Sequence, residues 1–387
     1  MNAIIKKRNL GQFFSTNSEY ILQGLSNFVI HKKIIDPFAG NRDLICWAFN
    51  HNAKEVIGFD IDNKYVDNKL VFSGDSLNST KEYSNRYKFI LTNPPYLHKN
   101  KATKEIKEKF FFGKNSQFED LYQVSISSIL NCEEGIIIVP LNFLCAEKKK
   151  KIRELFFAKF EIIKLNIFSE QVFDDTTYNV ISFYFKKKQK ASDKNIIDAT
   201  IYPENKKIKL TLEKKSGWQF GGDFIYKIKN IKNGLGVFRL TNDYLKSGEY
   251  EIEIALQNIK DKKIIKISDD IKKLLEKNIL FLRAIDSKNG KKIQLEDIRK
   301  YKIAGLVGKN TSRNMAHLIF KKEVSIIEQI ELMKKFNSEL SVNREKYLSF
   351  FLTNFRDNNR KRISFDLVYK FLNLIYYEQN SKQPALF

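Results

Sequence analysis

The first half of the chain alternates short apolar runs with segments whose apolar residues recur at helical spacing. The runs KKIID, EVIGFD, LVFSG and YKFILT are nearly continuous in apolar residues, whereas DLICWAFNHN and FEDLYQVSISSILNC carry theirs three or four positions apart. Nearly continuous apolar strands are typical of sheets buried on both faces, and strands that alternate with helices form mostly parallel sheets. This pattern predicts a doubly wound α/β domain.

Two further strands and a polar stretch close this half. EIIKLNIF and YNVISFYFKK are separated only by SEQVFDDTT, which predicts an antiparallel pair at one end of the sheet. The polar, aperiodic stretch KKKQKASDKN follows and is expected to link two domains. We therefore predict a first domain over residues 1–186, a linker over 187–195 and a second domain over 196–387.

The second half has a different pattern. GEYEIEIALQNIK alternates with a period of two, while EVSIIEQIELMKKFNSEL and SFDLVYKFLNLIYYEQ are amphipathic at helical spacing. Ser364 precedes the last of these segments and is a candidate N-cap. The mixture predicts an α+β domain.

Charge indicates the class of partner. The 387 residues carry a formal net charge of +23, which favours a polyanion such as nucleic acid. A compositional bias towards Lys, Asn and Ile would produce the same charge, so charge alone does not settle the partner. The three cysteines and four histidines are scattered, so we expect a reducing compartment and no metal site. We also expect a cytoplasmic protein, because GIIIVPLNFLCA is too short to span a bilayer and no signal peptide is evident.

Polar residues follow four of the predicted strands. They are the stretch DPFAGNRD, the acid Asp60, the pair Gly74-Asp75 and the corner Asn93-Pro94-Pro95-Tyr96. Ligands of open α/β sheets bind at the carboxyl ends of the strands, and an acid roughly twenty residues after the first turn is the usual partner of ribose hydroxyls. Asp75 is able to accept from an adenine amino group. A nucleoside site is therefore expected at this edge.

The Asn-Pro-Pro-Tyr corner has a specific chemical use. Proline cannot continue a central strand, so the two prolines make a stiff turn. The side-chain oxygen of Asn93 and the carbonyl of Pro94 can then accept from both N–H bonds of an exocyclic amine. These contacts would favour the pyramidal geometry that frees the nitrogen lone pair. Tyr96 can stack on the aromatic ring that carries the amine.

This ordered set resembles the S-adenosylmethionine-dependent DNA adenine-N6 methyltransferases of type II restriction–modification systems. The order is that of the gamma class, whose target-recognition domain is C-terminal, and the resemblance extends roughly from GQFF to SFYF. It implies a Rossmann-like fold, S-adenosylmethionine as methyl donor, no metal, and double-stranded DNA with a flipped-out adenine as substrate. It also implies a monomer on DNA, with any cognate restriction endonuclease encoded separately.

The same resemblance assigns roles to individual residues. Those of the Asn-Pro-Pro-Tyr corner, Asn93 to Tyr96, would be catalytic, and Phe173 in QVFDDTTYNV would hold the extruded base together with Tyr96. The residues implied to bind the cofactor are Gln12, Phe13, Phe14, Thr16, Asp36, Phe38, Ala39, Gly40, Asp60, Ile61, Asp75, Ser76 and Asn93.

One position departs from the family pattern. The first motif usually reads D-x-F-x-G-x-G, and its second glycine is Arg42 here. This difference puts the usual backbone path of the loop in doubt and would place a cation near the carboxylate of the cofactor.

Two basic stretches in the second half are candidates for contact with DNA, although ordinary solvated surface is the alternative for both. They are GKNTSRNMAH and FRDNNRKRISF, and their cations are Lys309, Arg313, Arg356, Arg360, Lys361 and Arg362.

Other functions remain open. A protein glutamine methyltransferase uses the same corner, although the basic second half and GQFF argue against it. RNA adenine methyltransferases more often carry a hydrophobic residue at the first proline. FDIDNK can be read as part of a magnesium-dependent nuclease, which would cut DNA. A non-catalytic DNA-binding module would tolerate the loss of Asn93.

Overall fold

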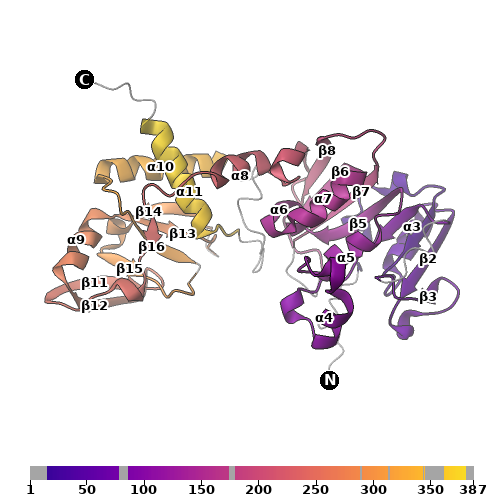
Figure 1. The fold of residues 1–387 in the computed structure, drawn as a ribbon, viewed down its shortest axis with the longest axis horizontal. Helices are drawn as coiled ribbons and strands as arrows, with labels where there is room; N and C mark the ends of the chain where they lie inside the picture. The colour runs from indigo at the N-terminus through magenta and orange to yellow at the C-terminus, as the bar shows by residue number, and fades with distance from the viewer. Residues whose placement is uncertain are drawn as a thin grey trace. The chain divides into compact units, whose positions relative to one another are not determined.

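The computed structural model describes residues 15–77, 86–173, 179–287, 290–312, 314–342, 344 and 361–380. The chain divides into two compact units, with the division at Gly222 (Figure 1). Among the helices of the described ranges, none combines the length and apolarity needed to cross a membrane.

The first unit is built on a nine-stranded sheet with the order β3-β2-β1-β4-β5-β7-β6-β8-β9. Neighbouring strands from β3 to β5 are parallel. The α/β fold class expected from the sequence is confirmed. The strands are β1 Lys33–Asp36, β2 Glu55–Asp60, β3 Val71–Ser73, β4 Phe89–Thr92, β5 Glu134–Pro140, β6 Phe160–Phe168, β7 Val180–Lys187, β8 Lys194–Tyr202 and β9 Lys206–Glu213.

The parallel strands of this sheet could be predicted from the sequence because they are buried and nearly continuously apolar. Every residue of β4 is buried, and β5 is buried from Gly135 to Pro140. Close backbone packing also occurs, because a Cβ added to Gly135 would lie 2.3 Å from the carbonyl oxygen of Ile90. The glycine therefore permits the tight pairing of β5 with β4.

Helices flank the sheet. Helix α3 packs against β2, and α5 lies beside α7 (Figure 1). Helix α5 begins with a capping box, in which Asp120 and Gln123 satisfy the backbone groups of the first turn. The helices of this unit are α2 Ser18–Ile21, α3 Asp43–Asn50, α4 Lys104–Phe110, α5 Leu121–Ser128, α6 Asn142–Cys145 and α7 Lys150–Lys159.

The antiparallel pair predicted for one end of the sheet lies inside it. Strand β7 is inserted between β5 and β6 and is antiparallel to both. Strand β8 then pairs in parallel with β6, and β9 forms the edge. Strand propensity identified the pair, whereas its place in the order depends on contacts between strands distant in sequence.

The structure also corrects the predicted linker. Residues 187–195 include the end of β7 and the start of β8, so they form a turn within the sheet and not a connection between domains. The polar composition of this stretch reflects an exposed strand connection. The first unit therefore continues beyond the predicted boundary to Gly222, where helix α8 Gly222–Lys229 begins.

The second unit has a four-stranded and a three-stranded sheet, with orders β10-β16-β13-β14 and β12-β11-β15. Its α+β character is as predicted, and Ser364 caps the last helix by accepting from Leu367 N at 3.2 Å. The elements are β10 Phe238–Arg239, β11 Tyr250–Leu256, β12 Lys262–Ile267, α9 Asp269–Lys277, β13 Leu280–Arg283, β14 Gln294–Asp297, β15 Gly305–Val307, β16 Met315–Ile319, α10 Ile326–Val342 and α11 Phe365–Asn380.

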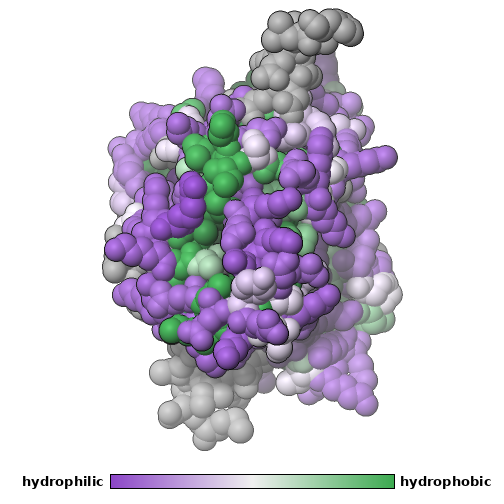
Figure 2. Space-filling view, turned by 90° about the vertical axis from the view of Figure 1, so that its left-hand side faces the viewer, coloured by the Kyte–Doolittle hydropathy of each residue, from purple (hydrophilic) through white to green (hydrophobic). Residues whose placement is uncertain are grey.

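The surface of this unit is mostly hydrophilic on the face seen in Figure 2, where a stripe of apolar residues crosses it. An apolar hollow in the same unit is lined by Ile252 of β11, Leu275 of α9 and Ile326 at the start of α10. The main core of the unit packs α10 and α11 against the four-stranded sheet.

The order of the first sheet creates a ligand-binding position. Strand β1 pairs with β2 on one side and with β4 on the other, so the chain changes direction across the sheet at β1. In open α/β sheets such a switch point leaves a crevice outside the carboxyl ends of the strands.

Candidate active site

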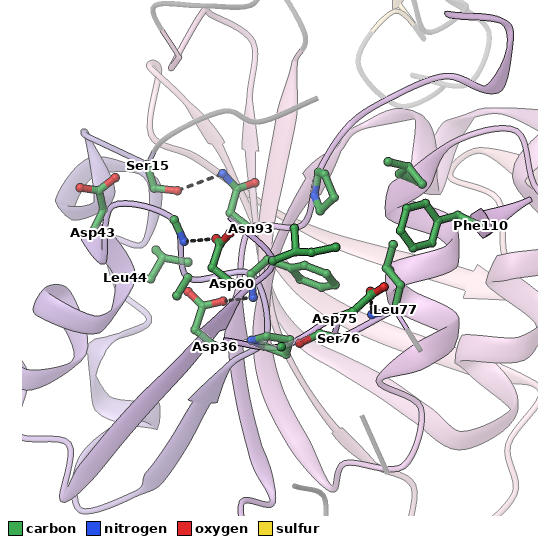
Figure 3. A pocket seen from close by; sticks show the side chains of 18 of the residues that line it. Ser15, Asp36, Asp43, Leu44, Asp60, Asp75, Ser76, Leu77, Asn93 and Phe110 are labelled. Carbon is green, nitrogen blue, oxygen red and sulfur yellow. Dashed lines mark hydrogen bonds between the residues drawn. The ribbon is translucent and has the colours of Figure 1, made fainter. Parts of the chain in front are cut away.

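A pocket occupies this switch point, at the carboxyl ends of β1 to β4 (Figure 3). It is open to solvent on one side and is lined by both acidic and apolar side chains. The predicted site residues that line it are Asp36, Phe38, Ala39, Gly40, Asp60, Ile61, Asp75, Ser76, Asn93 and Pro95. The four strand ends that the sequence marked therefore meet at one site.

Other predicted residues lie elsewhere. Thr16 is exposed and is not among the lining residues, and neither are Pro94, Tyr96 and Phe173. Gln12, Phe13 and Phe14 lie outside the described residues.

Sequence reasoning missed part of the wall. One side is apolar and includes Leu77 and Phe110 (Figure 3) together with Ile106. Leu77 follows β3, whereas Ile106 and Phe110 both belong to α4. No local pattern marks Ile106 or Phe110 as pocket residues, because α4 carries them from an excursion after β4. The lining residues to which no individual role was assigned are Ser15, Pro37, Asp43, Leu44, Gly74, Leu77, Ile106, Phe110 and Leu121. Among them, Pro37, Asp43 and Gly74 lie in stretches that the sequence marked.

Asp60 organises the floor of the pocket. Its Oδ2 accepts from Gly40 N at 2.9 Å, and its Oδ1 accepts from Asp62 N at 2.8 Å. Burial raises the pKa of Asp60, and the two backbone donors oppose that shift. Each carboxylate oxygen has a further lone pair, so Asp60 can still accept from a ligand hydroxyl.

Asp36 is the most deeply buried acid of the site, with 1% of its surface exposed. Its Oδ1 accepts from Thr92 Oγ1 at 2.7 Å and from Phe38 N at 3.0 Å. Burial raises the pKa of Asp36 from 3.8 to about 7, and the two hydrogen bonds only partly oppose this effect.

This shift predicts a pH-dependent stability. The folded protein binds the Asp36 proton more tightly than the unfolded chain, so the free energy of unfolding falls as pH rises from 3.8 to about 7. Asp36→Asn keeps an oxygen acceptor but cannot ionise. We compare the free energy of unfolding of Asp36→Asn with that of the wild type. We expect this difference to be more favourable to the variant at pH 8 than at pH 5, by on the order of 2 kcal/mol.

Chemical denaturation of both proteins at the two pH values, without cofactor, measures this difference. All other titrating groups are shared and cancel in the comparison. An identical difference between variant and wild type at pH 5 and pH 8 would contradict the shift.

Asp75 lies beside Ser76 and Leu77 in the pocket (Figure 3). Its Oδ1 accepts from Leu77 N at 3.2 Å, and its Oδ2 forms an ion pair with Lys109 Nζ at 3.0 Å. Lys109 belongs to α4, so this pair joins the strand end to the apolar wall of the pocket.

Asn93 is held at both ends of its amide. Its Nδ2 donates to Ser15 Oγ at 3.1 Å, and its Oδ1 accepts from Tyr96 Oη at 2.5 Å. Ser15 is buried and lies in the pocket wall, so the segment before β1 helps to orient the amide (Figure 3). Asn93 thus lines the same pocket as Asp36, Asp60 and Asp75.

Tyr96 and Phe173, which were predicted to share a role, lie next to each other. Their ring centroids are 6.5 Å apart in an edge-to-face arrangement. Both rings are buried, and Tyr96 Oη also lies 2.9 Å from the carbonyl oxygen of Ile138. Burial raises the pKa of Tyr96, so its hydroxyl keeps its proton and can donate.

Arg42 resolves the departure from the family pattern. Its φ of 73° is in the left-handed region, so the backbone follows a path that favours glycine although the residue is arginine. Its Nη1 pairs with Asp67 Oδ2 at 2.6 Å and is not directed to the pocket lining. The cation expected near the cofactor carboxylate is therefore bound to Asp67.

The basic residues predicted to contact DNA are only partly described. Lys309 is exposed, whereas Lys361 and Arg362 are half-buried, and Arg362 forms a backbone bridge with Ile285. Arg313, Arg356 and Arg360 lie outside the described residues.

Comparison with known proteins gives one family match. Residues 15–173, which include the pocket and the Asn-Pro-Pro-Tyr corner, match the family model of the Eco57I restriction-modification methylase. No curated protein matches the chain.

Several solved structures are similar to this chain at low sequence identity. A methyltransferase subunit of a type I restriction-modification system from Streptococcus thermophilus shows 15% identity and a TM-score of 0.35, with 51% of this chain and 50% of that chain covered. The type IIG restriction endonuclease BpuSI shows 11% identity and a TM-score of 0.45, with 97% and 61% covered. The type IIL restriction-modification enzyme MmeI, solved in complex with DNA, shows 11% identity and a TM-score of 0.48, with 100% and 73% covered. The chain thus spans only half to about three quarters of these proteins.

Proposed function

We propose that this protein is a DNA methyltransferase that uses S-adenosylmethionine to methylate the exocyclic amino nitrogen of adenine in double-stranded DNA. The observation that carries the proposal is the meeting of Asp36, Asp60, Asp75 and Asn93 around one pocket at the switch point of the sheet. The match of residues 15–173 to a restriction-modification methylase family supports the same class of reaction.

The pocket residues fit S-adenosylmethionine chemically. Asp60 retains lone pairs for the ribose hydroxyls after accepting from Gly40 N and Asp62 N. Asp75 would accept from the adenine amino group, and the apolar wall that includes Ile106 and Phe110 would pack against the adenine ring. Ser15 and the predicted residues Phe38, Ala39, Gly40, Ile61 and Ser76 would complete the cavity.

Asn93 would prepare the target amine. Its Oδ1 and the Pro94 carbonyl would accept from the two N–H bonds, which favours a pyramidal nitrogen with an available lone pair. Ser15 holds the opposite end of the amide, so Oδ1 is the end presented to the target. Tyr96 Oη, which now donates to Oδ1, can turn to the Ile138 carbonyl when the amine arrives.

S-adenosylmethionine, when bound, supplies an electrophilic methyl group: the N–C bond forms as the C–S bond breaks, sulfur keeps the electron pair, and the amine loses one proton to solvent. The prolines keep both acceptors in place during this step. The target base must leave the duplex, and Phe173 with Tyr96 would offset part of the unstacking cost of a few kcal/mol.

A labelling experiment tests the reaction and the base together. The purified protein is incubated with methyl-labelled S-adenosylmethionine and duplex DNA from a host without DNA methylation, and the nucleosides are then analysed by mass spectrometry. We expect label in N6-methyladenine only. Label in a cytosine derivative would overturn the assignment to adenine, and label found only in protein or RNA would overturn the assignment to DNA.

A further inference from the structure

The chain makes an excursion between β4 and α5. We call residues 98–118 the cap segment. Its base is closed by a bridge between His98 and Asp120 and by hydrogen bonds from Lys99 N to Glu119 O at 2.7 Å and from Leu121 N to Leu97 O at 3.0 Å. Both ends of the excursion are therefore anchored at one place beside the sheet.

The cap segment contains buried aromatic side chains and a capped helix. Phe110, Phe111 and Phe118 are buried. Thr103 caps α4 by accepting from Ile106 N at 3.3 Å. The excursion is therefore folded, with some of its side chains buried and others exposed.

One side of the cap segment is part of the pocket. Ile106 and Phe110 line it, and Lys109 pairs with Asp75 across it at 3.0 Å. The cap segment therefore lines the same pocket as Asn93, which would hold the target amine. The solvent-exposed residues of the segment form its outer surface.

That outer surface is basic. Between His98 and Phe118 the sequence has six lysines and two glutamates. Lys101, Lys104 and Lys114 are exposed. Lysines on an exposed surface are suited to the phosphates of a nucleic acid backbone.

An exposed aromatic residue lies within the same surface. The side chain of Phe112 is 63% exposed, although it directly follows two buried phenylalanines. The space beside it is open, because a Cβ added to the next residue, Gly113, would meet no atom within 4 Å. Removal of an apolar ring from water is favourable, so this position favours a bound state in which the ring is covered.

We propose that the cap segment is a DNA-binding surface of the first unit. Its lysines contact phosphates on either side of the target nucleotide, and Phe112 packs against the bases or sugars that the extruded nucleotide leaves behind. The inference rests on the proposed function. A target base held at Asn93 stays joined to its DNA backbone, so that backbone must pass near the cap segment, which lines the same pocket. Apolar wedges of this kind support distorted DNA in other proteins.

A charge-matched comparison tests the phosphate contacts. Lys101→Gln/Lys114→Gln removes two exposed lysines of the cap segment. Lys54→Gln/Lys187→Gln removes two exposed lysines at the opposite edge of the sheet, where Lys54 precedes β2 and Lys187 ends the antiparallel β7. The affinity for a fluorescent 30-base-pair duplex is measured by anisotropy at several salt concentrations, with wild-type protein alongside.

We expect the cap variant to bind about tenfold more weakly and to lower the slope of log affinity against log salt by about 2. The control variant should match the wild type. Equal affinity and slope for the cap variant and wild type would overturn the proposal, as would equal losses in both variants.

Phe112→Ala tests the wedge, with Phe112→Leu as the conservative variant. We expect Phe112→Ala to lower turnover on duplex DNA about tenfold and Phe112→Leu to retain most of the wild-type turnover. The melting temperature of the protein should stay unchanged in both variants. Turnover that is insensitive to alanine would exclude the wedge.

The two proposals fail in distinguishable ways. DNA binding needs no methyl transfer, so a selective loss of affinity in the cap variant upholds the surface even if wild-type protein transfers no methyl group. Wild-type DNA affinity in the cap variant, together with normal methylation by the wild type and by Phe112→Ala, would refute the surface and leave the proposed function intact.

Discussion

Asn93→Ala is expected to reduce methyl transfer by about 10³-fold or more, because it removes the acceptor that would hold the target amine in its reactive geometry. The fold should tolerate the change. Tyr96 Oη keeps the Ile138 carbonyl as an acceptor at 2.9 Å, and Ser15 loses only the donation from Nδ2. Initial rates with labelled S-adenosylmethionine and unmethylated DNA measure the loss.

Binding measurements on Asn93→Ala distinguish a loss of methyl transfer from a loss of cofactor or DNA binding. Affinities for S-adenosylmethionine, by calorimetry, and for duplex DNA, by anisotropy, should stay close to wild type. Tyr96→Phe is the matched control, since it removes the hydroxyl that donates to Oδ1 but leaves the amide and the ring, and it should retain most of the rate. Near-normal turnover by Asn93→Ala would refute the assigned role of the corner.

The second large effect is expected for Asp60→Ala, which should weaken S-adenosylmethionine binding by about 10²-fold, since hydrogen bonds to a charged acceptor contribute roughly 1.5–3 kcal/mol each. The substitution removes the proposed acceptor of the ribose hydroxyls. It also removes the acceptor of Gly40 N and Asp62 N, which hold the two loops of the pocket floor together.

Asp62→Ala is the control for this prediction. Asp62 is a neighbouring acid whose side chain accepts from Lys64 N, and it is not among the residues that line the pocket. Calorimetric titration with S-adenosylmethionine should show nearly wild-type affinity for Asp62→Ala. Unchanged affinity of Asp60→Ala would remove Asp60 from the ribose site.

Much of the site was predictable because parallel strands impose a simple geometry. Their carboxyl ends lie at one edge of the sheet, so polar residues that follow successive apolar strands are brought together. Asp36, Asp60, Asp75 and Asn93 each follow or end such a strand, and all four line the pocket. The identity of residue 42 did not reveal the path of its loop. Arg42 adopts the left-handed backbone conformation that favours glycine, although it is not a glycine.

Other features depended on contacts between distant segments. Polar composition at residues 187–195 could not distinguish an exposed turn within a sheet from a linker between domains. The bond between Ser15 and Asn93 joins residues 78 positions apart, and the pair Lys109–Asp75 places α4 over the pocket. No local periodicity encodes such pairings.

The sequence alone determined the α/β class of the first unit and the composition of its functional edge, since burial on both faces and the stiffness of Asn-Pro-Pro-Tyr act within a few residues. Only the tertiary structure decided that β7 lies between β5 and β6, that the first unit ends at Gly222, and that the cap segment forms a wall of the pocket. These features arise from the packing of residues far apart in the chain, where many arrangements satisfy the same local preferences and the burial of apolar surface selects among them.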